Sequence, residues 1–134
     1  MTQIIYTDGS CIPKTGSGGY GFVILPSEED PHEWHVSGGE DCTTNNRMEL
    51  TAVIEALTFC HTKSYFTIYS DSMYVINCAK GVWARKKNID LWKKYDEISC
   101  GKNIDWVWVK SHSGNKYNEI VDLLAKKEVL AKNK

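Results

Sequence analysis

Several features are missing from this sequence, and each absence excludes a class of protein. No apolar run in the 134 residues approaches the length needed to span a membrane. Met1-Thr2-Gln3 leads straight into a strand-like segment without the basic region or cleavage site of a signal peptide, so we expect a cytoplasmic protein. The five cysteines are odd in number and include no Cys-x-x-Cys pair, which favours free thiols over a disulfide framework or a zinc site.

The sequence also lacks a strong charge of either sign, and it contains no internal repeat, linker or low-complexity segment. Its net charge is −1, whereas nucleic-acid binders usually carry a basic surface. Basic residues nevertheless gather at residues 80–94 and near the C-terminus, where they form either a binding surface or an ordinary solvated face. The length and the apolar and charged fractions, 42% and 25%, predict one globular domain over residues 1–134, which we expect to be a monomer.

Alternation and helical periodicity predict an α/β chain. β-branched and aromatic residues predict five strands, and apolar residues at helical spacing predict four helices. The expected strands are 3–8, 20–25, 32–38, 65–71 and 103–109, with a glycine-rich turn at 16–19 before the second. The expected helices are 45–60, 72–79, 88–98 and 115–131, the last carrying Ile120, Leu123, Leu124 and Val129 inward.

Two aspartates occupy equivalent places in this pattern. Asp8 ends the first strand and Asp71 ends the fourth. A strand, a helix and a further strand normally place the two strands parallel, although here a hairpin precedes the helix. If the two strands are parallel neighbours, Asp8 and Asp71 lie side by side at the edge where open α/β sheets bind ligands.

Glu49 stands at an unusual position in the helix predicted over 45–60. It shares a face with Ala52, Val53 and Ala56, which is the spacing of a buried stripe. A buried carboxylate is costly unless it is paired or binds a metal. The alternative for this residue alone is an exposed glutamate that favours the helix dipole from the first turn.

Asp122 on the last helix completes a set of four carboxylates with Asp8, Glu49 and Asp71. Each alone has an ordinary explanation as a turn, cap or surface residue. Together they suit the hard cations Mg²⁺ or Mn²⁺, which bind oxygen ligands. Two such ions about 3.5–4 Å apart can activate water and stabilise the leaving oxygen in phosphodiester hydrolysis.

Short motifs follow one another along nearly the whole chain. They are Tyr6-Thr7-Asp8-Gly9-Ser10-Cys11, Gly18-Gly19-Tyr20-Gly21, the stretch from Thr43 to Leu50, Ser70-Asp71-Ser72, Trp108-Val109-Lys110 with His112, and Asn118-Glu119 with Asp122. In their order and spacing these motifs resemble ribonuclease H of type 1. The resemblance implies a five-stranded mixed sheet flanked by helices on both faces, with strands one to three antiparallel and strands four and five parallel to strand one. It also implies endonucleolytic cleavage of the RNA strand of RNA/DNA hybrids, leaving 5′-phosphate and 3′-hydroxyl ends.

The resemblance further implies roles for individual residues. Asp8, Glu49, Asp71 and Asp122 would bind two Mg²⁺ or Mn²⁺ ions, with Asp8 bridging both. His112 would assist proton transfer and product release, and its ordinary alternative is an exposed histidine. The residues that would contact the hybrid are Gly9, Ser10, Cys11, Thr44, Asn45, Asn46 and Trp83. For the asparagines the alternative is helix capping, and for Trp83 it is a core position.

The sequence departs from the family pattern between the second and third helices. Many bacterial members carry a long basic protrusion there, whereas this chain has only residues 81–89, with Arg85-Lys86-Lys87 as a candidate remnant. Lys14 and Met73 also replace residues that are usual in the family. Two other functions compete with the nuclease: a hybrid- or double-stranded-RNA-binding module without catalysis, and a resolvase or integrase core. The intact carboxylates disfavour the first, and the Asn-Asn-Arg-Met-Glu block disfavours the second.

Overall fold

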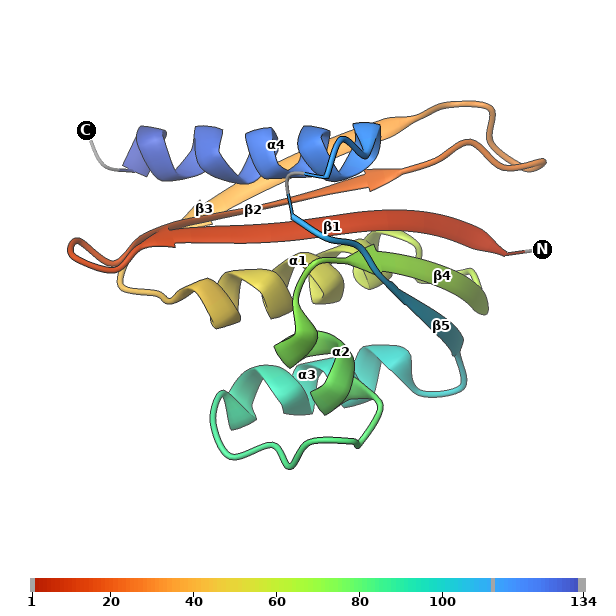
Figure 1. Ribbon diagram of the computed structural model, residues 1–134. Helices are drawn as coiled ribbons and strands as arrows, with labels where there is room; N and C mark the ends of the chain where they lie inside the picture. Colours follow the sequence, from red (N-terminus) through yellow and green to blue (C-terminus); the bar gives the residue numbers. More distant parts are fainter. Residues whose placement is uncertain (1, 112, 133–134) are drawn as a thin grey trace.

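The protein folds as a single mixed β-sheet between two layers of helices (Figure 1). The structure is a computed structural model, and it describes residues 2–111 and 113–132. The strands are β1 Gln3–Ile12, β2 Ser17–Ile24, β3 Trp34–Glu40, β4 Tyr65–Ser70 and β5 Asn103–Trp108. Their order across the sheet is β3-β2-β1-β4-β5. The first three strands pair antiparallel, and β4 and β5 run parallel to β1, which confirms the predicted fold class.

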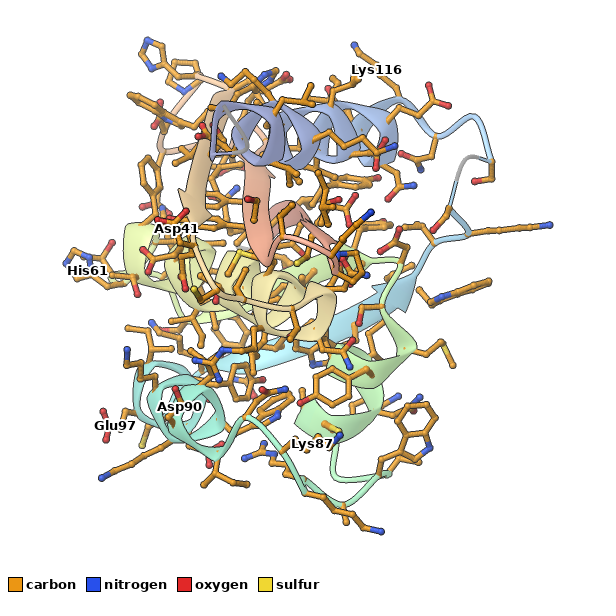
Figure 2. All side chains as sticks on the ribbon, turned by 90° about the vertical axis from the view of Figure 1, so that its left-hand side faces the viewer. Asp41, His61, Lys87, Asp90, Glu97 and Lys116 are labelled. Carbon is orange, nitrogen blue, oxygen red and sulfur yellow. The ribbon has the colours of Figure 1, made fainter. Side chains whose placement is uncertain are left out.

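The helices divide between the two faces of the sheet. They are α1 Asn45–Phe59, α2 Met73–Ala79, α3 Ile89–Ser99 and α4 Lys116–Lys132. Helix α4 contacts β1, β2 and β3 on one face, while α1 contacts β1 and β2 on the other and is itself covered by α2 and α3. Figure 2 shows these layers from the side, with Lys116 at the start of α4 and Asp90 on α3 at opposite ends of the molecule. Among the described residues, no helix is both long and apolar enough to cross a membrane.

Side-chain caps fix where α1 and α2 begin. The hydroxyl of Thr44 accepts from the backbone N–H of Arg47, and the hydroxyl of Ser72 accepts from that of Val75. Both bonds satisfy backbone donors that a helix leaves unpaired in its first turn. Helix α1 therefore begins four residues before Glu49, and α2 begins two residues after Asp71.

The first strand was predicted over residues 3–8, and this C-terminal boundary was wrong, because β1 runs on to Ile12. β1 pairs with β4 only as far as Tyr6, opposite Tyr69, but it continues against β2 up to Ile12, opposite Ser17. Asp8 therefore does not end its strand but lies just beyond the parallel pairing. The residues predicted as a turn at 16–19 belong largely to β2, where Gly19 lets α4 approach closely, since a Cβ there would lie 2.2 Å from the carbonyl oxygen of Ala125.

The buried face of α4 also differs from the prediction. Leu123 is 67% exposed, so its inward assignment was wrong. The fully buried stripe is Val121, Ala125 and Val129, while Ile120 and Leu124 are half-buried and flank it. The residues of this stripe are small because α4 lies close to the glycines of β2, which leaves little space for larger side chains.

Candidate metal-binding active site

Three carboxylates from different elements meet at one edge of the sheet. Asp8 projects from β1 two residues after the last parallel pair with β4, and Asp71 directly follows the end of β4. Glu49 comes from the second turn of α1. One carboxylate oxygen of each residue lies within 4.8 Å of the other two, which is a spacing that can hold a metal ion.

The backbone of Gly9 organises the buried pair. Its N–H donates to Oδ1 of Asp8 at 2.8 Å and to Oε1 of Glu49 at 2.9 Å. A side chain at this position is excluded, because a Cβ would lie 2.3 Å from backbone atoms of Met48 and Glu49. This point of contact therefore requires glycine, which lets β1 and α1 touch directly.

The second oxygen of Glu49 supports a metal at this site. Oε2 is buried, and among the described residues it has no hydrogen-bond partner. A hydrogen bond between Glu49 and Asp8 would require that one of the two carboxyls hold a proton, because two ionised carboxylates offer only acceptors. A buried acceptor without a donor is costly, and a divalent cation would satisfy it.

Burial dominates the electrostatics of the pair. Burial raises the pKa of Asp8 to about 7, with further increases from the charges of Asp71 and Asp122 and opposing hydrogen bonds from Glu49 and Gly9. Burial also raises the pKa of Glu49 well above its ordinary value, and the charge of Asp8 raises it further. Without a cation, the two groups therefore favour a shared proton near neutral pH.

Asp122 lines the same pocket but is held differently. It lies on α4, and its Oδ2 is 3.1 Å from the ammonium of Lys126 one turn later. Asp122 is not part of the group of carboxylates within 4.8 Å of one another among the described residues. The structure thus brings three of the four predicted ligands together and places the fourth beside them in an ion pair.

The pocket around these carboxylates is open and polar, with a volume of about 340 Å³. It is lined by Asp8, Gly9, Ser10, Asn45, Asn46, Glu49, Asp71, Ser72, Ser111, Asp122 and Lys126. A second hollow of about 400 Å³ is lined by Cys11, Pro13, Thr43, Thr44, Asn45 and Asn46. Because both hollows share the two asparagines at the start of α1, they adjoin one another.

The remaining predicted site residues fall into three groups. Gly9, Ser10, Asn45 and Asn46 line the carboxylate pocket, while Thr44 and the buried Cys11 line only the adjoining hollow. Trp83 is 47% exposed and lies outside both, so the alternative of a core position is wrong. His112 lies outside the described residues.

Three residues that line the pocket were not among the predicted site residues: Ser72, Ser111 and Lys126. The hydroxyl of Ser111 donates to Oδ2 of Asp71 at 2.6 Å, and Lys126 pairs with Asp122. The spacing of Lys126, four residues after Asp122, was a usable signal, because residues four apart meet on a helix surface. No pattern pointed to Ser111, which reaches Asp71 only because its loop follows the neighbouring strand β5.

Fold and site together define a class: an α/β protein with an acidic pocket, suited to divalent cations, at the C-terminal edge of its parallel strands. A family model for RNase H matches residues 1–130. A ribonuclease H of Pseudoalteromonas translucida is 45% identical over 139 residues, covering 93% of this chain and 88% of that protein. A ribonuclease H of Ehrlichia ruminantium is 40% identical over 141 residues, covering 95% and 94%.

A solved structure has the same fold. LC11-RNase H1, crystallised in complex with RNA/DNA hybrid, superposes with a TM-score of 0.81 at 24% identity, covering 99% of this chain and 100% of that one. The chain therefore belongs to the ribonuclease H family, type 1, and is a nuclease hydrolase.

Proposed function

We propose that this chain hydrolyses the RNA strand of RNA/DNA hybrids with the help of two divalent ions, Mg²⁺ or Mn²⁺. The observation that carries the proposal is the meeting of Asp8, Glu49 and Asp71 within 4.8 Å, beside Asp122, in a chain of the ribonuclease H family. The hybrid as substrate is supported by the related LC11-RNase H1, which was crystallised with one. We further propose that the domain acts as a monomer.

The proposed ligands are Asp8, Glu49, Asp71 and Asp122. The charges of both Asp71 and Asp122 raise the pKa of Asp8, so Asp8 is close to both, and this closeness suits a carboxylate shared by two ions. When bound, the ions would supply an activated water and stabilise the leaving 3′ oxygen, giving 5′-phosphate and 3′-hydroxyl ends. Two hydrogen bonds orient Asp71 for this task. The hydroxyl of Ser111 donates to its carboxylate, and the indole N–H of Trp108 donates to its backbone carbonyl.

We propose that the hybrid passes over the two adjoining hollows. Asn45 and Asn46 are exposed at the N-terminus of α1, where backbone N–H groups favour a phosphate. Ser10 lines the carboxylate pocket, and the neighbouring Cys11 is buried with its thiol on the carbonyl of Thr43, so Cys11 would contact a substrate only through its backbone. Contacts of this kind in a minor groove can read 2′-hydroxyls and so distinguish RNA from DNA.

The proposed grip on the DNA strand lies in the segment between α2 and α3. Trp83 is exposed there and can pack against a sugar or base. Lys86 and Lys87 are exposed in the same segment, and Lys87 is labelled in Figure 2. Arg85 is unavailable for this, because its guanidinium binds Asp96 at 2.8 Å and the carbonyl of Cys78 and stacks 4.4 Å above the ring of Trp92. The candidate basic remnant is thus reduced to two lysines, and binding should depend only weakly on salt.

His112 is proposed to assist proton transfer and product release. Histidine titrates near neutral pH, which suits a residue that accepts and returns a proton. Because metal activation lowers the need for a strong protein base, we expect loss of His112 to slow hydrolysis without abolishing it.

A cleavage assay tests the proposal directly. Labelled RNA/DNA hybrid is incubated with the protein in parallel Mg²⁺ and Mn²⁺ series, with single-stranded RNA and a DNA junction as competing substrates. Asp71→Asn should lower hybrid cleavage by orders of magnitude while keeping the fold, because it removes charge from the cluster. Asp105→Asn, an exposed aspartate outside the pocket, is the matched control.

Three outcomes would contradict the proposal. Absence of hybrid cleavage by folded protein with either ion would remove the nuclease assignment and favour a binding module. Cleavage of the junction alone would favour a resolvase. Full activity of Asp71→Asn would remove this carboxylate from the reaction.

A further inference from the structure

We infer that Lys126 competes with a metal ion for Asp122 and so sets how tightly the ion that uses this carboxylate is bound. The inference rests on the proposed function of the site. Lys126 and Asp122 lie one turn apart on α4, and both line the carboxylate pocket. The ammonium is 3.1 Å from Oδ2 of Asp122, which is ion-pair distance.

The four carboxylates are not equivalent before a metal binds. Asp8 and Glu49 share the N–H of Gly9, and Asp71 accepts from the hydroxyl of Ser111. Those donors are neutral, so no basic side chain in the described part of the pocket competes with a cation for these three residues. Asp122 alone is paired with a full positive charge within the described part of the pocket, and it lies outside the group within 4.8 Å.

This difference predicts two classes of metal affinity. An ion bound by Asp8, Glu49 and Asp71 displaces only the proton that Asp8 and Glu49 share, and no basic side chain in the described part of the chain pairs with these three residues. An ion that needs Asp122 must displace the ammonium of Lys126 and then bind beside it, and like charges at such short range repel. The side chain of Lys126 is 51% exposed, so it can turn into solvent when displaced. Lys126 is therefore a positioning residue that acts through Asp122.

Calorimetric titration with Mn²⁺ tests this inference on the full chain. Lys126→Gln should tighten the weaker Mn²⁺ step by about fivefold, because one positive charge near a divalent ion is removed. Lys127→Gln removes the same charge from the adjacent exposed residue, which does not line the pocket, and should leave both steps unchanged. Lys126→Arg keeps the charge and should restore the wild-type affinity.

The dependence on Asp122 gives a second test. In an Asp122→Asn background, Lys126→Gln should no longer tighten Mn²⁺ binding, because the group for which the lysine competes is gone.

Thermal unfolding of the metal-free protein gives a third test. In the wild-type background, Lys126→Gln should lower the melting temperature more than Lys127→Gln, since Asp122 loses its counter-charge beside the acidic cluster. Saturating Mn²⁺ should reverse that order.

Equal effects of Lys126→Gln and Lys127→Gln on Mn²⁺ binding would overturn the competition while leaving the metal site intact. Persistence of the Lys126→Gln effect without Asp122 would overturn it in the same way. Failure of wild-type protein to bind Mn²⁺ at all would instead overturn the metal-dependent function, and the competition with it.

Discussion

Replacing Asp8 by asparagine should stabilise the metal-free protein at neutral pH although it removes activity. Burial raises the pKa of Asp8 from 3.8 to about 7. Between these values the folded state holds a proton that the unfolded chain has released, so the stability of the folded state falls as pH rises through this window. An asparagine side chain at this position carries no charge and removes this contribution.

The size of the effect follows from the shift. Three pKa units at about 1.4 kcal/mol each set an upper bound of about 4 kcal/mol at pH 7.5. The asparagine amide can also donate to Glu49, whose Oε2 otherwise has no partner among the described residues. For a domain of this size, about 2–4 kcal/mol corresponds to an increase in melting temperature of roughly 10 °C.

Thermal and urea unfolding in EDTA at pH 4.5 and pH 7.5 measure this effect, with Asp105→Asn as the control outside the pocket. The advantage of Asp8→Asn should be large at pH 7.5 and small at pH 4.5, where wild-type Asp8 is protonated when folded. Saturating Mg²⁺ should favour the wild type instead, because a ligand stabilises the folded protein that binds it more tightly. A variant that is less stable than wild type at pH 7.5, or a difference independent of pH, would refute the assignment of a buried acidic cluster.

Two further predictions concern packing. Gly9→Ala should destabilise the fold by about 3 kcal/mol or more and lower activity, because its Cβ would lie 2.3 Å from the backbone of Met48 and Glu49. Unfolding and cleavage assays check this prediction. A neutral effect would contradict the direct contact of β1 and α1. Val121→Ala should cost about 1–3 kcal/mol, since Val121 is fully buried, whereas Leu123→Ala should change stability by at most about 0.5 kcal/mol. A larger loss of stability for Leu123→Ala than for Val121→Ala in urea unfolding would show that Leu123 and not Val121 faces the core.

The sequence was most informative where a pattern is local. The alternation of β-branched residues located all five strands, because this property depends on neighbours within a few residues. The apolar face shared by Glu49 correctly indicated its burial. The parallel pairing of β1 with β4 confirms what the strand–helix–strand order indicated only conditionally, because a hairpin lies between the first strand and the helix.

Long-range packing decided what the sequence could not. The pairing partner determined that β1 extends beyond Asp8, and the approach of α4 to the glycines of β2 determined that Val121 rather than Leu123 is buried. Likewise, the exposure of Trp83 depends on how the segment after α2 folds back, which periodicity does not report.

For the acidic site, too, the sequence determined some features and the tertiary structure decided others. The sequence by itself determined which residues carry the carboxylates and on which elements they stand, because residue type and periodicity are properties of the chain. Only the tertiary structure decided that the half-buried Asp71 joins the buried Asp8 and Glu49 in one cluster, while Asp122 pairs with Lys126 and Ser111 reaches Asp71. Distances between side chains on separate elements are set by the packing of the sheet and helices, and no local pattern encodes them.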